Sequence, residues 1–534
     1  MKNDRKTALA LYKLSLKFYL AVVGLSMALS LTAEAGVRLE PIGTFKTGVF
    51  ASGAAEIVSH DPASQRLFVI NASSQAVDII DIANPANPVS VGSFDITAYG
   101  EQANSVAVNN GVVVAVVEAN PKQDPGRAVF FNAATGVYIN DVVVGALPDM
   151  VTYTPDGTFV LVANEGEPSD DYTNDPEGSV SIIDLRDTTP AKLTQSAVKT
   201  AGFTQFNNRP LPYSIRVFGP GSTVAQDFEP EYISVYQRGN RWRAMVTLQE
   251  NNAIAEIDVA QAQVRKIHGL GFKNHSKAKN ALDASDKDNK INIRRWPVRG
   301  MYQPDSIASY TRHNRVFFVT ANEGDARDYA GFSEEVRIKD LVLDPEMFPD
   351  AATLQLEENL GRLKSTIALG DWDNDGDHDY LFSYGARSFS IWNRHFRQTF
   401  DSASDIAHIT STILPDDFNS DDEENASFDN RSDDKGAEPE GVAIGEIDGR
   451  TYGFIGLERT GGILTYDITN PYRPFFVNYV NTRDFHVVAG PGTGGDMSPE
   501  GLAFISAADS PNGKPLLVVS FEVSGSTTIF EIKI

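Results

Sequence analysis

The stretch EPEGVAIGEIDGRTYGFIGLERTGGILTYDI (438–468) contains one complete copy of the unit that decides the fold. It has three short, mainly apolar segments at 438–444, 452–458 and 463–468, and polar or glycine-rich turns separate them. Short apolar runs bounded by Gly, Asn and Asp are typical of β-strands and are too short for the helices of a globular protein. The unit therefore predicts three consecutive strands.

Units of the same kind recur along the chain. Each begins with a small or proline-containing turn and an acidic residue, and a second strand ending in Glu and a third of the type V-x-I-I-D-L follow. The first strands begin at AAEIV (54–58), ANSVAV (103–108), LPDMVTY (147–153), EPEYISV (229–235), QPDSIAS (303–309), EPEGVAI (438–444) and SPEGLAF (498–504). The third strands include 76–82, 179–185, 253–259, 336–341 and 463–468.

A further, degenerate unit of three apolar segments lies at 366–393, and with it the chain has eight units of propeller-blade length. Radial repetition lets each small sheet bury both faces against its neighbours. The last unit ends at its third strand, and PIGTFKT (41–47) can supply the fourth. We therefore predict an all-β propeller of eight four-stranded blades closed by an N-terminal strand. The alternative is seven blades, if the degenerate unit merges with its neighbour.

Length and composition fit one large domain. The chain has 534 residues, of which 42% are hydrophobic, so it can bury a sizeable core. We expect a single propeller over 36–534 with acidic loop insertions at 186–228, 271–300 and 415–437. The composition of the last insertion, which is rich in Asp and Glu, is by itself typical of disorder.

The N-terminus has the composition of a secretory signal peptide. Basic residues precede the apolar segment 18–31, and Ala33-Glu34-Ala35 resembles a cleavage site. The apolar segment is shorter than the roughly 20 residues of a spanning helix, so an uncleaved anchor is the weaker alternative. We expect residues 1–35 to be removed, which leaves a monomeric periplasmic or extracellular protein without a membrane span.

Cysteine is absent, and the formal net charge is −25. The absence of cysteine excludes thiol catalysis, zinc held by Cys and iron–sulfur clusters. Neither G-x-S-x-G nor H-E-x-x-H occurs, so two common hydrolase motifs are missing. The acidic balance favours divalent cations as partners and disfavours nucleic acid and anionic membranes.

Acidic residues occupy two positions of the repeat. The start of the first strand and the end of the second lie side by side in a hairpin, so blades around an axis bring both positions to one mouth of the channel. The first position holds Glu56, Asn104, Asp149, Glu231, Asp305, Glu440 and Glu500. The second holds Glu118, Glu165, Glu250, Glu323, Glu458 and Glu522.

Converging carboxylates repel one another unless they bind cations or keep their protons. We therefore predict a divalent cation at the acidic mouth, with calcium preferred because it accepts hard oxygen ligands in flexible numbers. The alternative is that these acids only solubilise the strand ends. Two similar loops, 164–172 and 322–329, are expected to overhang the mouth, with Asp171 and Asp328 as outer ligands.

The most specific local motif is DWDNDGDHD (371–379). Its acids and its glycine match the spacing of a calcium-binding loop. Phe382 stands where an EF-hand has Glu, so the motif is not an EF-hand and resembles the shorter Asp-rich loops found in β-propellers. The predicted calcium ligands are Asp371, Asp373, Asp375 and Asp379, together with the carbonyl group of Asp377.

Four phrases carry a resemblance to a known family: ANEGEPSDDY (163–172), GDWDNDGDHDYLFSYGARSFSIW (370–392), FDNRSDDKGAEPEGVAIG (428–445) and GLERTGGILTYDITNP (456–471). Together they resemble the choice-of-anchor I domain family, which includes mesenchyme-specific cell-surface glycoproteins linked to biomineralisation. The resemblance implies a secreted, propeller-like domain and suggests calcium, and it supplies no catalytic residue. The family is named for its varied C-terminal anchors, and no second hydrophobic segment is found here.

Two functions fit these observations. The first is a secreted calcium-binding propeller that acts as an extracellular binding or matrix protein on a polymer or a mineral surface. The alternative is a calcium-dependent phosphoesterase, similar to alkaline phosphatases or phytases, that acts on a phosphorylated small molecule at the acidic mouth. In that case Arg387 and Arg459 would bind the anion, although both could instead pair with neighbouring acids.

Overall fold

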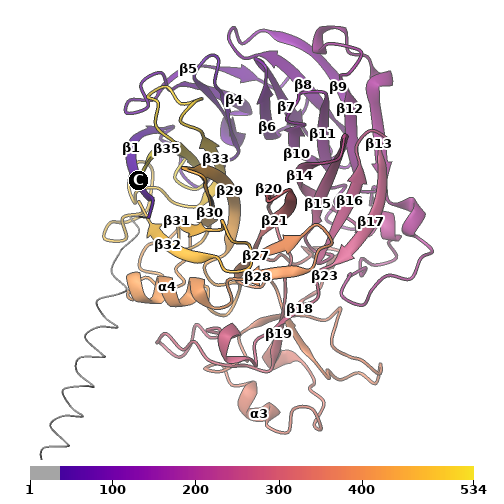
Figure 1. The fold of residues 1–534 in the computed structure, drawn as a ribbon. Helices are drawn as coiled ribbons and strands as arrows, with labels where there is room; N and C mark the ends of the chain where they lie inside the picture. The colour runs from indigo at the N-terminus through magenta and orange to yellow at the C-terminus, as the bar shows by residue number, and fades with distance from the viewer. Residues whose placement is uncertain (1–35) are drawn as a thin grey trace, which may run out of the picture. The chain divides into compact units, whose positions relative to one another are not determined.

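The computed structural model describes residues 36–534, so the predicted signal peptide lies outside the described range. Nearly all of the described residues, Leu39–Ile532, form one compact unit. Strands dominate the compact unit, and seven four-stranded sheets follow one another along it (Figure 1).

Five of the seven sheets are built from four consecutive strands. The fifth sheet takes β27 and β28 from beyond an insertion, and the seventh takes β1 from the N-terminal end. The first three are β2–β5 (Val58–Asp61, Arg66–Asn71, Ala76–Asp81, Val89–Asp95), β6–β9 (Ala103–Asn109, Val112–Val117, Pro125–Asn132, Tyr138–Ala146) and β10–β13 (Pro148–Tyr153, Phe159–Asn164, Ser179–Asp184, Val198–Gly202). The next three are β14–β17 (Pro230–Arg238, Arg241–Leu248, Ala253–Asp258, Gln263–Gly269), β20-β21-β27-β28 (Ile307–Arg312, Arg315–Asn322, Ser388–Asn393, Gln398–Asp401) and β29–β32 (Pro439–Ile447, Arg450–Leu457, Ile463–Asp467, Phe475–Val480). The seventh is β33-β34-β35-β1 (Pro499–Ile505, Leu516–Phe521, Ser526–Lys533, Arg38–Lys46).

The first strands of the seven sheets form a closed ring. Contacts run from β2 to β6, β10, β14, β20, β29 and β33, and from β33 back to β2. The second strands are buried, as in β11 and β34, where every residue is buried, because each sheet packs both faces against its neighbours. The molecule is an all-β propeller, as predicted.

The number of blades is seven, so the preferred number of eight is wrong and the alternative is correct. The degenerate unit at 366–393 forms no blade of its own, because β27 pairs with β21 as the third strand of the fifth blade. The segment 336–341, predicted as that third strand, holds the end of β24 (Glu335–Arg337) and the 3-10 turn η6 (Ile338–Asp340). The long insertion 323–387 separates β21 from its partner β27. The sequence pattern predicts pairing between strands that are close in sequence, so it does not predict this pair.

The N-terminal strand closes the ring, as predicted. β1 is the outer strand of the seventh sheet and pairs with β35, which lies almost at the other end of the chain. The hydroxyl groups of Thr44 and Thr528 lie 2.9 Å apart across this pair, and the Thr47 N–H donates to the Gly525 carbonyl at 2.9 Å.

Two insertions fold together into a lobe with its own core. Residues 271–300 contribute β18 (Phe272–Asn274) and β19 (Val298–Met301), and β26 (Leu381–Ser383) from the second insertion pairs with β19 in parallel. Buried side chains from both insertions meet in the lobe, including Leu282, Trp296, Leu343, Leu360 and Leu381. The lobe region also contains β22 (Asp328–Tyr329), β23 (Phe332–Ser333), β24, β25 (Lys364–Thr366) and α3 (Ala351–Leu354).

The other two insertions also differ from expectation. Part of 186–228 is the outer blade strand β13, and the remainder holds short turns and α2 (Val224–Asp227). The acidic segment 415–437, which follows α4 (Asp405–Ile413), is folded rather than disordered, with Phe418 fully buried. Its acids pair with basic residues from elsewhere in the chain, and composition alone does not show such partners: Asp433 pairs with Arg337 and Arg362, and Asp434 with Lys364.

Within the described residues no helix is both long and apolar enough to cross a membrane.

Candidate metal centre

β-Bulges place the acids at the start of the innermost strands. The register shifts near the first residues of β6, β10, β14, β29 and β33, where these strands pair with the second strands. The residues in or beside these shifts are Asn104, Asp149, Glu231, Glu440 and Glu500. A bulge bends the strand and redirects a side chain that would otherwise follow the regular alternation.

Glycine lets neighbouring blades come close at this mouth. Gly441 follows Glu440, and a Cβ atom added to it would lie 2.2 Å from the backbone oxygen of Glu500. Gly501 follows Glu500, and a Cβ atom there would lie 2.5 Å from the backbone oxygen of Glu56. The close approach of the strands brings the acids of the sixth, seventh and first blades together.

The acids at the ends of the second strands lie beside the openings of the same blades. The backbone N–H of Glu165 donates to the Leu147 carbonyl at 2.9 Å, and that of Glu522 donates to the Ser498 carbonyl at 2.9 Å. Both positions of the repeat therefore occupy the same end of the sheets. We call the carboxylates at this end the acidic mouth, and its members are Glu56, Asp149, Glu165, Glu231, Glu250, Asp305, Glu323, Glu440, Glu458, Glu500 and Glu522.

Burial and mutual repulsion raise the pKa values of nine of the acids at the mouth. Burial, then Glu522 and Asp149, raise the pKa of Glu56 to about 8. Burial, then Glu167 and Glu118, raise that of Asp149 to about 7. Burial with Asp325 raises the pKa of Glu250 to about 7. The same causes raise the pKa values of six more acids well above the ordinary range: Glu165, Glu231, Asp305, Glu440, Glu458 and Glu500.

Four acids of the mouth have a buried oxygen without a hydrogen-bond partner. These atoms are the Oε2 atoms of Glu231, Glu250, Glu440 and Glu500. Glu231 and Glu250 are only 8% and 7% exposed. A buried carboxylate oxygen without a donor is costly, and such groups in native proteins keep a proton or bind a cation.

One side of the mouth is neutralised by basic residues. The carboxylates of Glu323, Glu438 and Glu458 offer oxygens within 4.8 Å of one another. Lys435 lies 2.5 Å from Glu323 and 2.8 Å from Glu438, and Arg431 lies 2.6 Å from Glu438. Burial alone would raise the pKa of Glu438, but these charges hold it below its usual range.

Several charged residues beside the mouth are not among its predicted members. Glu167, Glu229 and Asp325 lie close enough to the mouth to raise the pKa values of its members. Arg327, 2% exposed, pairs with Glu229 at 3.0 Å and with Asp227 at 3.1 Å. Glu167 and Asp325 each stand two residues after a predicted mouth residue, so the repeated N-E-G-[ED] pattern could have identified them.

The two loops expected to overhang the mouth do meet, but not through their acids. Tyr172 packs edge-on against Tyr329, with ring centroids 5.5 Å apart, and the Gly331 N–H donates to the Asp170 carbonyl at 2.6 Å. The Asp171 carboxylate accepts hydrogen bonds from Ser169 and Thr173 of its own turn. Asp171 therefore stabilises this loop, and the expectation that it is an outer ligand is not supported by its contacts.

The Asp-rich loop 371–379 lies in the insertion between β21 and β27. Oxygens of Asp371, Asp373 and Asp375 come within 4.8 Å of one another. The Asp379 carboxylate accepts from the Trp372 N–H at 2.7 Å, and one Asp371 oxygen accepts from the Gly376 N–H at 3.1 Å. The other Asp371 oxygen, Oδ1, is buried without a partner. Burial and neighbouring acids raise the pKa values of Asp373 and Asp377.

The two arginines expected to contact an anion bind protein groups instead. Arg387 is buried, and its guanidinium donates to the carbonyls of Asp283 (2.6 Å), Ser432 (2.9 Å) and Asp434 (2.6 Å). Arg459 pairs with Asp422 at 2.7 Å, with Glu458 at 2.9 Å and with Glu438 at 3.3 Å. Arg459 therefore pairs with neighbouring acids, as the alternative stated. Arg387 instead binds backbone carbonyls, so its contacts are structural.

The chain is similar in sequence to one characterised protein and in fold to three solved structures. Gigasin-3a of Magallana gigas is 29% identical over 192 residues, which are 34% of this chain and 67% of that protein. Three solved structures are similar over 90–94% of this chain and at least 97% of their own, at 8–11% identity and TM-scores of 0.43–0.46. They are Kuenenia stuttgartiensis hydrazine synthase, the Cps50 (Swd1) β-propeller domain of Myceliophteria thermophila and streptogramin B lyase.

A sequence profile of the choice-of-anchor I domain matches residues 56–471, which include most of the blades, the lobe and the Asp-rich loop. This range is well over half of the chain, and the resemblance seen in the sequence is confirmed. The chain belongs to the choice-of-anchor I domain family.

Proposed function

We propose that this protein binds divalent cations, calcium first, at the acidic mouth and acts outside the cytoplasm as a calcium-binding propeller of binding or matrix type. The observation that carries the proposal is the set of four buried carboxylate oxygens without hydrogen-bond partners, on Glu231, Glu250, Glu440 and Glu500. The family supports a surface-associated or exported protein.

Charge balance supports a cation rather than a set of shared protons. Around Glu438 the basic residues Lys435, Arg431 and Arg459 compensate the acids. The side of the mouth that holds Glu231, Glu440 and Glu500 forms no salt bridge within the described residues. Calcium takes six to eight oxygen ligands in flexible geometry, and side chains from several blades can supply such a set.

The Asp-rich loop is proposed as a second, separate calcium site. Its three converging carboxylates, with Asp379 beside them and the Asp377 carbonyl available, make a ligand set made only of oxygen. Gly376 has φ +99, and only glycine adopts such a conformation readily, so the chain can turn sharply there.

Calcium titration by calorimetry tests the mouth. The full chain, freed of cations by a chelator, is titrated alongside Glu440→Gln and its control Glu446→Gln. Both residues lie on β29, but Glu446 is exposed and outside the mouth. We expect Glu440→Gln to weaken one class of calcium sites by about tenfold, since a ligand charge is lost, and Glu446→Gln to bind as the wild type does. No calcium binding by the wild type, or equal behaviour of the two variants, would contradict the proposal.

Phosphoester hydrolysis at the same centre remains the alternative prediction, with less support. Lys435, Arg431 and Arg459 lie beside the acids, but they pair with Glu438 rather than face an open site. Calcium-dependent turnover of p-nitrophenyl phosphate that Glu440→Gln abolishes and Glu446→Gln retains would favour the enzyme.

A further inference from the structure

A basic groove lies at the end of the propeller opposite the acidic mouth. The innermost strand β14 has Glu231 near its start and ends at Arg238, and β20 follows Asp305 and ends at Arg312. A strand advances by about 3.3 Å per residue, so on each of these strands the acid and the arginine stand at opposite ends of the blade. The two ends of the propeller therefore differ in charge.

Turns from three neighbouring blades line the groove. Two adjoining hollows, of about 530 and 490 Å³, share Arg315, Phe317 and Tyr472 in their walls, and each has the size of a pocket for a small ligand. The first hollow continues to Arg312, and the second to Arg238 and Arg394. Because the hollows share a wall, together they form one elongated groove across the fourth, fifth and sixth blades.

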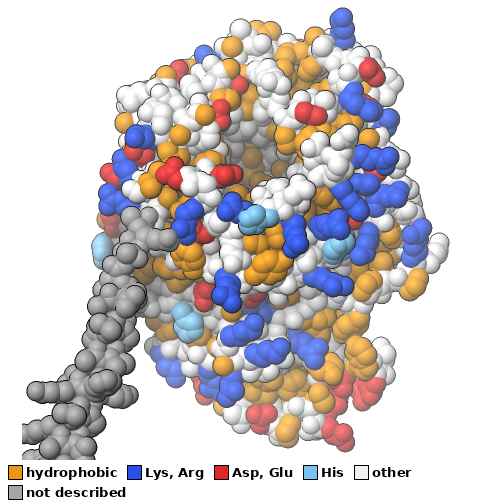
Figure 2. Space-filling model, in the orientation of Figure 1, with side chains coloured by type: hydrophobic (Ala, Val, Ile, Leu, Met, Phe, Trp, Pro, Cys, Tyr) orange, Lys and Arg blue, Asp and Glu red, His pale blue; other side chains and the backbone are white. Residues whose placement is uncertain are grey.

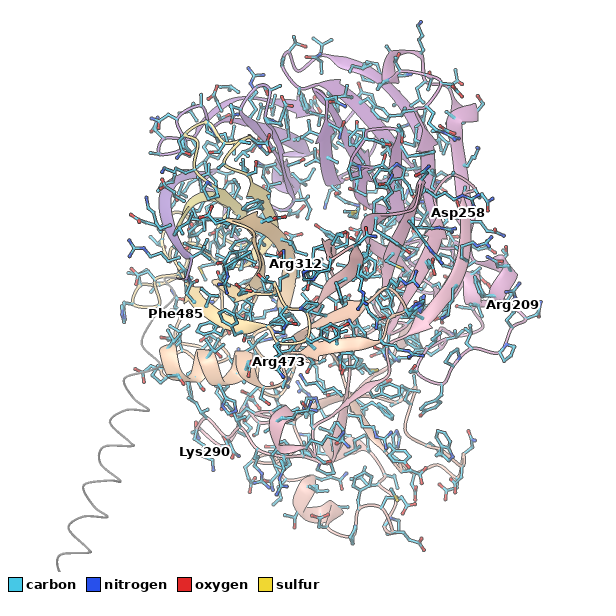
Figure 3. All side chains as sticks on the ribbon, viewed as in Figure 1. Arg209, Asp258, Lys290, Arg312, Arg473 and Phe485 are labelled. Atoms are coloured by element: carbon cyan, nitrogen blue, oxygen red, sulfur yellow. The ribbon has the colours of Figure 1, made fainter. Side chains whose placement is uncertain are left out.

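The groove and its rim hold seven basic side chains that form no salt bridge among the described residues. Within residues 36–534 they are Arg238, Lys266, Arg312, Arg315, Arg394, Arg397 and Arg473. In the orientation shared by Figures 2 and 3, Arg312 and Arg473 lie toward the middle of the view, where Lys and Arg side chains gather.

The surroundings of His395 give a second measure of this charge. Slight burial, followed by the charges of Arg394, Arg397, Lys266 and Arg238, lowers the pKa of His395. Two carboxylates lie close to this set. Glu256 contacts His268 at 3.8 Å, and its pKa is lowered by His268 and then by the charges of Arg243 and Arg238. Asp467 pairs with Arg450 at 2.5 Å. The protein has a net charge of −25, yet basic side chains without a salt bridge are concentrated at this groove.

An exposed aromatic ring stands between the cations. Tyr472 is 54% exposed and packs edge-on against the buried Phe317, with ring centroids 6.0 Å apart. The contact holds the ring against the blade, and more than half of the side chain stays exposed. An apolar ring face suits the hydrophobic face of a sugar, while arginine forms strong hydrogen bonds to sulfate or carboxylate groups.

We propose that this groove binds an acidic polysaccharide, with Tyr472 stacked on a sugar ring and the arginines paired with its sulfate or carboxylate groups. The concave, elongated shape suits a linear chain better than the flat surface of a membrane. A long duplex nucleic acid would extend beyond the groove onto the rest of a strongly acidic protein, whereas a short acidic oligosaccharide can stay within the groove. The groove shares no residue with the acidic mouth, so this proposal stands or falls separately from the proposed function.

The test uses the full chain and a fluorescently labelled heparin oligosaccharide, with polarisation as the measurement. Arg315→Glu combined with Arg394→Glu reverses two charges in the groove. The matched control, Arg209→Glu combined with Lys290→Glu, reverses two exposed charges elsewhere, at positions labelled in Figure 3. We expect the groove variant to bind at least about tenfold more weakly and the control to stay within about twofold, because two arginine–anion pairs are lost and each new carboxylate repels the ligand. Tyr472→Ala should weaken binding without reducing its salt dependence.

Further probes test whether the groove prefers an acidic polysaccharide to other negatively charged ligands. Uncharged dextran should not bind, and polygalacturonate should compete with heparin. Tighter binding of a DNA oligonucleotide, or of vesicles containing phosphatidylglycerol, than of the oligosaccharide would overturn the proposal. So would an equal loss of affinity in the two variant pairs. Thermal melts verify that each variant is folded, and Arg315→Gln with Arg394→Gln replaces the reversal pair if that pair unfolds.

Discussion

Arg387 shows how one buried side chain can join separate parts of the fold. Its guanidinium donates to carbonyls of the lobe (Asp283) and of the acidic segment (Ser432 and Asp434). We expect Arg387→Ala to lower the free energy of unfolding by about 3 kcal/mol, because three buried acceptors lose a charged donor. Urea denaturation measures the change, and exposed Arg394→Ala should stay within about 0.5 kcal/mol. A similar small effect for Arg387→Ala would show that the contact is not structural.

Single residues also set the direction of the acids at the mouth. Glu440 and Glu446 lie on the same strand, yet Glu440 points into the mouth and Glu446 into solvent. The bulge at the start of β29 causes this difference. Residue type alone does not distinguish the two, because both are glutamates beside apolar neighbours.

At the scale of elements, the Asp-rich loop should act as a calcium site independent of the mouth. We expect the triple variant Asp371→Asn, Asp373→Asn and Asp375→Asn to lose one bound calcium per chain, because each amide replaces a charged ligand. The control changes three acids of the same insertion, Asp340, Glu346 and Asp350, to their amides and should keep the wild-type stoichiometry. Calorimetry or metal analysis after dialysis counts the ions. Unchanged stoichiometry in the loop variant would exclude this loop as a site.

The closing strand β1 has a different role, since it covers the edge of the last blade. A chain that begins after residue 47 would expose the edge of β35 and lose the contacts of Thr44 and Thr47. We expect it to unfold at lower temperature and to aggregate, because exposed edge strands pair with other chains. Size-exclusion chromatography and thermal unfolding, compared with a chain that begins at residue 36, test this. A monomer of unchanged stability would show that closure does not depend on β1.

At the scale of the whole molecule, the acidic mouth should make stability depend on pH and on cations together. Glu56, Asp149 and Glu250 have folded pKa values of about 8, 7 and 7, above their ordinary values of 4.5, 3.8 and 4.5. The folded state therefore holds more protons than the unfolded state between these limits. In a chelator, the free energy of unfolding should fall as pH rises from about 4.5 to about 8, by about 1.4 kcal/mol for each unit of raised pKa.

Excess calcium should remove most of this fall, because the ion replaces the protons. Urea denaturation at several pH values, with chelator and with calcium, measures both curves. Glu438 has a lowered pKa, so its contribution is lost only as pH falls below about 4.5 and lies outside this window. Parallel curves in chelator and in calcium would contradict a cation at the mouth.

The repeat itself was predictable, because strand alternation, turns and the acids at strand ends are local properties of the sequence. The closing role of 41–47 also followed, since the last unit lacked a fourth strand. The blade number did not follow, because the partner of β21 lies beyond the insertion 323–387. The folded state of 415–437 was missed for a related reason, since its acids find their basic partners far away in the chain.

The sequence by itself determined an all-β propeller, the two acidic positions of its repeat and the Asp-rich loop, because short-range patterns encode each of them. Only the tertiary structure decided that there are seven blades, that two insertions share one core, and that Arg387 binds carbonyls rather than an anion. It also placed the acids and the unpaired arginines at opposite ends of the blades. The physical reason is that burial and pairing depend on contacts between residues distant in sequence, and the free energy of a charge depends on those neighbours.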